Sequence, residues 1–267
     1  GLGLGLVGLR NFLAIDTPQA GDPRILQVGL LTLATIILFN IWGRGRLRAF
    51  AVFTGLVVGQ SLALWLGLVD AERLARLNDA LDTINKAIEV VPENSMNHAV
   101  KGFVLDWLSG STADENERQS LLTQAEQEVI YAIQLDNQNN LALAYYAEIL
   151  VDQQKWIQAE QNIRQALERA PELMDVHRIN GYVQESLGNY NQAISEYEEA
   201  IRINPNLTFI YLRIGANYRR LAAQGSPSIE NPLYIKALEY FEKAAIINEQ
   251  LGVNDPIPYF SIATTYT

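Results

Sequence analysis

Small residues and a proline recur every 34 residues in the middle of the chain. The equivalent places hold Gly181, Ala193, Ala200 and Pro205 in residues 174–207, and Ala147, Ala159, Ala166 and Pro171 in residues 140–173. Small side chains let two packed helices approach closely, and a proline cannot continue a helix. A fixed period of this length predicts an all-α solenoid, in which each pair of helices contacts its neighbours.

Residues 174–207 read MDVHRINGYVQESLGNYNQAISEYEEAIRINPNL and resemble the tetratricopeptide repeat, a 34-residue helix–turn–helix unit. Besides the small residues, the resemblance rests on Leu187 and Gly188 at the end of the first helix, Tyr190 at the turn and Tyr197 in the second helix. It implies a concave surface, formed by the first helices, that binds an extended peptide or a helix of another protein.

Further units are predicted on both sides. Upstream, a first helix around Gly102 is followed by a polar interruption at residues 109–119 and a second helix around Val129. Downstream, a first helix around Gly215 is followed by an interruption at residues 222–233 and a second helix around Phe241. Residues 78–94 supply a second helix, and residues 255–267 begin another first helix. Residues 70–267 therefore form a predicted solenoid of about four repeats plus partial terminal units. We expect the natural chain to continue, or a partner to cover this last half-unit.

Two uncharged runs precede the repeats, at residues 25–42 and 49–69. At about 1.5 Å per residue each reaches about 30 Å, the thickness of a hydrocarbon core, so the fold class predicted is all-α, with a transmembrane helical hairpin before the solenoid. Residues 43–48, GRGRLR, place the tip of the hairpin in the cytoplasm. An integral-membrane protein with extracytoplasmic repeats (periplasmic, luminal or extracellular) is expected. Residues 1–24 are interpreted as an apolar or interfacial segment.

The second run carries small residues at every fourth position, which predicts a helix-packing face in the membrane. These residues are Ala51, Gly55, Gly59, Ala63 and Gly67. The partner of this face stays open between the first run, a second copy of the chain and another subunit.

Charge and composition argue against several classes of partner and of catalytic chemistry. Residues 70–267 are strongly acidic within a chain of net charge −10, which argues against nucleic-acid partners. The absence of Cys excludes thiolate catalysis and Cys-ligated zinc. His98 and His177 both fall at the fourth place of a first helix, where packing is favoured over metal ligation. We predict no catalytic, cofactor-binding or metal-binding residues, and no enzyme activity.

In the repeat frame, the second, fifth, ninth, twelfth and thirteenth places of each first helix face the groove. The candidate partner-binding residues are Phe103, Trp107, Glu148, Arg178, Tyr182, Glu185, Phe209, Arg219 and Arg220. The Lys, Asn and Arg set with which family members clamp chaperone tails is absent at the matching places, so that binding is not expected. Completion of the core by Phe103, Trp107 and Tyr182 is the alternative to partner contact.

The leading hypothesis for function is a membrane-anchored scaffold or accessory subunit that binds other proteins within a membrane complex, with the lipid bilayer as a second partner. Two alternatives stay open. In the first, the chain is the repeat-containing tail of a polytopic envelope polysaccharide polymerase or ligase, since some of these enzymes carry such repeats. In the second, it is an assembly factor that visits a membrane complex, including a photosynthetic one, only transiently.

Overall fold

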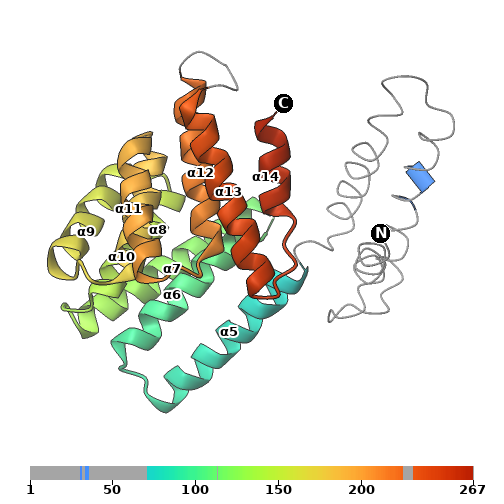
Figure 1. The fold of residues 1–267 in the computed structure, drawn as a ribbon. Helices are drawn as coiled ribbons and strands as arrows, with labels where there is room; N and C mark the ends of the chain where they lie inside the picture. Colours follow the sequence, from blue (N-terminus) through green and yellow to red (C-terminus); the bar gives the residue numbers. More distant parts are fainter. Residues whose placement is uncertain (1–30, 32–33, 36–70, 113, 225–230, 267) are drawn as a thin grey trace. The chain divides into compact units, whose positions relative to one another are not determined.

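The computed structural model describes residues 31, 34–35, 71–112, 114–224 and 231–266 (Figure 1). The chain divides into two compact units, Gly1–Ala80 and Leu81–Thr267, and the second contains most of the described residues. The helices are α5 (Ala71–Val90), α6 (Ser95–Ser109), α7 (Glu115–Leu135), α8 (Asn140–Asp152), α9 (Trp156–Arg169), α10 (Met174–Ser186), α11 (Tyr190–Ile203), α12 (Thr208–Ala223), α13 (Pro232–Gln250) and α14 (Ile257–Thr265).

The helices of the second unit pack as consecutive pairs, which Figure 1 shows following one another along the chain. The pairs are α6 with α7, α8 with α9, α10 with α11, and α12 with α13, and α14 packs on α13. The second helix of each pair also contacts the first helix of the next pair. The predicted tetratricopeptide-like solenoid is therefore confirmed for the described residues, which contain helices and no strand.

Glycine at the eighth place of a first helix permits close crossing within a pair. A Cβ atom added to Gly181 would lie 2.5 Å from the ring of Tyr197, and one added to Gly215 would lie 2.4 Å from the ring of Phe241. Both distances are far below van der Waals contact. Tyr197 and Phe241 are almost completely buried, so the large ring of each second helix fills the space that the missing side chain leaves.

The turns inside two successive pairs share one backbone geometry. Gly188 has a φ of 80°, and Gln154, which lies 34 residues earlier, has a φ of 61°. At each turn the following residue donates a backbone hydrogen bond across the end of the first helix, from Lys155 to Leu150 and from Asn189 to Gln184. This left-handed conformation after a helix end suits glycine, whereas it strains glutamine.

The Gln154→Gly substitution should therefore stabilise the protein, by about 1 kcal/mol, because glycine adopts this conformation without a steric penalty. Gln154 is exposed, so the substitution removes no core packing. Urea unfolding of the variant and the parent chain measures the difference. The Gly188→Ala substitution is the reciprocal control and should destabilise by a similar amount; equal stability of all three proteins would contradict this interpretation.

Part of each predicted interruption is helical. The polar stretch 109–119 contains the first turn of α7, where Asp114 caps the helix by accepting hydrogen bonds from the backbone N–H groups of Asn116 and Glu117. In the second interruption, α12 continues to Ala223 and α13 begins at Pro232, capped by Asn231. The residues that cap α7 and α13 lie inside the insertions, so each of these helices begins before its insertion ends. The extra residues therefore lengthen helices as well as turns.

In the parts of the chain that the structure describes, no helix has both the length and the apolar character of a membrane span. The predicted integral-membrane localisation with extracytoplasmic repeats is contradicted by this finding. The long helix α5 carries charges such as Arg76, Asp79 and Lys86. The apolar helix α8 has 13 residues, or about 20 Å, which is short of a bilayer core of roughly 30 Å.

Several predictions fall on residues that are not described. The runs 25–42 and 49–69 lie outside the described residues except for Leu31, Ala34 and Thr35. The predicted segment 1–24 lies outside them entirely. The same holds for the membrane-packing face of Ala51, Gly55, Gly59, Ala63 and Gly67.

Candidate protein-interaction surface

Aromatic side chains connect the inner faces of the first helices. Phe103 of α6 stacks on Tyr145 of α8, with 4.7 Å between ring centroids, and lies 5.3 Å from Trp107. Trp107 in turn meets Phe209 of α12 edge to face at 6.4 Å. Since α12 lies three repeats after α6, the first helices curve tightly enough for their side chains to meet across the groove. Of the predicted aromatic groove residues, Phe103, Trp107 and Phe209 are thus connected through ring contacts, whereas Tyr182 is not part of this chain of rings.

Two charged residues predicted to line the groove, Arg178 and Glu148, bond to each other. Arg178 donates to both carboxylate oxygens of Glu148, at 2.7 and 2.8 Å, and through Nε to Asp175 at 2.9 Å. Its guanidinium carbon also lies 5.5 Å from the centroid of the Phe103 ring. Arg178 and Glu148 are both buried. They hold α8 to α10, and their charged groups bond within the chain.

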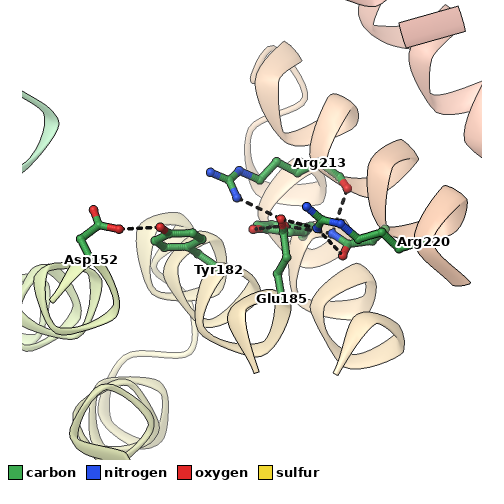
Figure 2. Close-up of polar contacts among 7 residues, drawn as sticks. Asp152, Tyr182, Glu185, Arg213 and Arg220 are labelled. Atoms are coloured by element: carbon green, nitrogen blue, oxygen red, sulfur yellow. Dashed lines mark hydrogen bonds and ion pairs between the residues drawn. The ribbon is translucent and has the colours of Figure 1, made fainter. Parts of the chain in front are cut away.

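Two carboxyl groups share the space beside this pair. Tyr182 donates a hydrogen bond to Asp152 at 2.5 Å, as Figure 2 shows. Asp106 of α6 is 2% exposed, its carboxyl is hydrogen-bonded to Asp152, and its Oδ1 has no hydrogen-bond partner. Burial, followed by the negative charges of Asp152 and Glu148, raises the pKa of Asp106 well above its usual value. The fold therefore favours the neutral form of the Asp106 carboxyl over the charged form.

The Asp106→Asn substitution should stabilise the protein at neutral pH. Because the folded-state pKa of Asp106 is raised, its contribution to stability is full below the unfolded pKa and declines as pH rises towards the folded pKa. Asparagine is neutral at every pH and still offers a donor to Asp152. The gain should be about 1–3 kcal/mol at pH 7 and should shrink towards pH 5. Urea unfolding at several pH values measures it, with the exposed Glu242→Gln as control; a gain independent of pH would contradict the prediction.

Glu185 gathers donors from α11 and α12 (Figure 2). It accepts hydrogen bonds from Arg220 at 2.6 Å, Asn217 and Tyr197 at 3.0 Å, and Arg213 at 3.2 Å. Burial acts to raise the pKa of Glu185, but the two arginines and Asn217 outweigh it and the pKa is lowered. The side chains of Arg213 and Arg220 remain 41% and 45% exposed. They are oriented by Glu185 and still reach solvent.

Arg219 differs from the other candidate residues. It donates to Thr264 of α14 at 3.0 Å and lies over the ring of Phe241, so it faces the next repeat.

Two inner-face residues were missed by the sequence reasoning, Tyr145 and Arg213. Both hold the sixth place of a first helix, three residues before the ninth place and therefore on the same helix face. That spacing was the available signal.

Both histidines connect neighbouring repeats. Each imidazole Nε2 lies 2.7 to 2.8 Å from the carbonyl oxygen of the proline that closes the preceding unit, Pro92 for His98 and Pro171 for His177. Each Nδ1 lies 2.6 to 2.8 Å from a glutamate of the same unit, Glu128 or Glu196. Tyr211 donates to Pro205 from the same fourth place. The described residues contain no group of three or more metal-ligating side chains.

Comparison with known proteins supports the repeat assignment. The tetratricopeptide repeat family model matches residues 181–207. The human IFIT1 dimer, solved with m7Gppp-AAAA, has a similar fold, with a TM-score of 0.60 and 18% identity over 98% of this chain and 60% of that one. MamA matches with 20% identity over 66% of this chain and 91% of that one, at a TM-score of 0.43.

Short stretches also match a transporter class. The chain is 40% identical over 76 residues to the uracil permease of Bacillus caldolyticus, which covers 28% of this chain and 17% of the permease. The uracil permease of Paenibacillus larvae is 37% identical over 49 residues, covering 18% of this chain and 12% of the permease. The chain thus spans less than one fifth of either relative.

Proposed function

We propose that this chain, which contains a tetratricopeptide repeat at residues 181–207, is a protein-interaction scaffold whose inner face binds a segment of another protein. The contacting part would be the α10 and α12 end of the predicted groove. The observation that carries the proposal is the arrangement of Arg213 and Arg220, which Glu185 fixes in place while both guanidinium groups remain accessible. Donors that are held before binding lose little conformational entropy when a partner docks.

Aromatic surface accompanies these donors. Arg213 lies 4.7 Å from the centroid of the Tyr182 ring, and Arg220 lies 5.6 Å from that of Tyr190. Phe209 is 37% exposed at the start of α12. Arginine and aromatic side chains are the residue types that dominate binding energy at protein interfaces. By contrast, Glu148 and Arg178 are proposed to shape the groove from below, since they are buried and bonded to each other.

A role in RNA binding, as in the solved IFIT1 complexes, is not proposed. The chain as a whole has a net charge of −10, which disfavours binding to phosphates. A catalytic role is not proposed either. The polymerase-tail and membrane-assembly alternatives depend on a membrane setting, and no described helix could span a membrane.

Selection of a displayed peptide library on the full chain tests the proposal. Enriched peptides should protect α10 and α12 from hydrogen exchange, and the Arg213→Ser/Arg220→Ser variant should bind them at least about tenfold more weakly. The matched control is Arg164→Ser/Arg202→Ser, which removes two exposed arginines from the second helices α9 and α11. No enriched peptide, or protection confined to the second helices, would refute the proposal.

A further inference from the structure

A pocket of about 610 Å³ opens where three turns between repeats meet. It is formed by the turn before α6, the turn between α7 and α8, and the turn between α9 and α10. Its size lies within the range of ordinary ligand pockets. It is distinct from the Arg213 and Arg220 surface, because none of its lining residues comes from α11 or α12.

Part of the pocket lining is apolar, and this part is called the floor below. Met96 and Leu141, each at the second place of its helix, form it together with Leu135, Ala170 and Leu173. Met96 is 43% exposed, although a thioether side chain gains by burial. Methionine also adapts its shape to varied ligands. The floor therefore offers apolar area that the fold itself leaves in contact with water.

Three residues of the pocket lining are acidic, and they are called the rim below. They are Glu93, Asp136 and Glu172, which are all exposed, and the pocket lining contains no Lys, Arg or His. Glu93 and Glu172 follow the closing prolines of their units, Pro92 and Pro171. The residue after the next closing proline is the uncharged Asn206, so the acidic rim does not extend to the following turn.

The helix ends at the pocket do not offset this charge. The N-terminal N–H groups of α6 and α8 could attract an anion, but Asn94 accepts from the backbone of Asn97 and Asn139 accepts from that of Ala142. The guanidinium of Arg169 donates to the backbone oxygen of Asn137 at 3.1 Å in the same turn, but it is not part of the lining. The carboxylates therefore make the charge of the pocket negative.

We infer that this pocket binds an extended protein segment in which an apolar side chain is flanked by Lys or Arg. The apolar side chain would cover Met96 and Leu141, and the flanking cations would pair with Glu93, Asp136 and Glu172. The inference rests on the proposed scaffold function and names a second contact and its chemistry. Charge complementarity selects a basic segment over an acidic one, and it disfavours nucleic acids and anionic lipids.

The probe for the test is a synthetic fluorescein-labelled peptide that alternates Lys and Leu between Gly residues, titrated by fluorescence anisotropy against the full chain. The Glu93→Gln/Asp136→Asn/Glu172→Gln variant should weaken binding about tenfold. The matched control is Glu239→Gln/Glu242→Gln/Glu249→Gln, which removes the same charge from exposed positions of α13 and should change affinity less than about twofold. The Met96→Ser variant should weaken binding by about fivefold.

Equal weakening by both triple variants would show that the peptide senses only the net charge of the chain, and this would overturn the inference. Unchanged affinity of the rim variant, or equal affinity for a peptide with Glu in place of Lys, would also overturn it. These results leave the scaffold proposal standing if library peptides still protect α10 and α12. If the library selection yields no peptide but the Lys and Leu peptide binds tightly, the proposal for α10 and α12 is refuted. The inference about the pocket is then retained.

Discussion

The Arg178→Met substitution is expected to lower the free energy of unfolding by about 3–5 kcal/mol, the range for breaking a buried ion pair. Arg178 neutralises Glu148, which is 6% exposed, and it also bonds Asp175. Without the guanidinium, Glu148 would remain buried beside the carboxyl groups of Asp106 and Asp152, with no cation at hydrogen-bonding distance. Urea unfolding followed by helical circular dichroism measures the loss.

The control for this prediction is Arg164→Met. Arg164 pairs with Glu160 at 3.1 Å on the surface of α9, where the two side chains are 65% and 41% exposed, and its removal should cost less than about 0.5 kcal/mol. The Glu148→Leu/Arg178→Met double variant should recover more than half of the loss, because no uncompensated charge then remains buried. An Arg178→Met loss no larger than that of Arg164→Met would show that the pair contributes only as a surface ion pair does.

Local spacing predicted the helix pairs well. The small residues at Gly181, Ala193 and Ala200 identify where two helices cross, and proline at 205 identifies where a unit ends; both signals act over a few residues. The observed helices α10 and α11 lie within the predicted unit 174–207. The extended helices inside the insertions were harder to predict, because an N-cap such as Asp114 lies in a polar stretch that also reads as a loop.

Which groups the side chains of the inner face contact could not be predicted from the sequence. The repeat frame predicted that Glu148, Arg178 and Tyr182 lie on that face, because helix position decides which way a side chain points. Whether they contact a partner or one another depends on the rotation between successive repeats. That rotation brings Trp107 to Phe209, although about a hundred residues separate them, and no local pattern encodes it.

A methyl group added at Gly215 should destabilise the protein by about 2–3 kcal/mol, near the upper part of the range for an overpacked core. A Cβ atom there would lie 2.4 Å from Cε1 of Phe241, which is 1% exposed and has no room to withdraw. Gly215→Ala therefore tests the helix crossing directly. Gly110→Ala is the control: its Cβ atom would meet only the backbone oxygen of Trp107 at 3.6 Å, so its effect should stay within about 0.5 kcal/mol.

The 140–173 repeat suggests how this loss can be relieved. Its equivalent places hold Ala147 and Ile163, both buried, so this fold accepts alanine in the first helix opposite a smaller apolar residue in the second. The Gly215→Ala/Phe241→Ile variant should therefore be more stable than the sum of its single substitutions predicts, by at least about 1 kcal/mol. Phe241 suits this double-mutant cycle better than Tyr197, whose hydroxyl also donates to Glu185. Additive losses measured by urea unfolding would mean that the close approach of Gly215 and Phe241 does not determine how these helices pack.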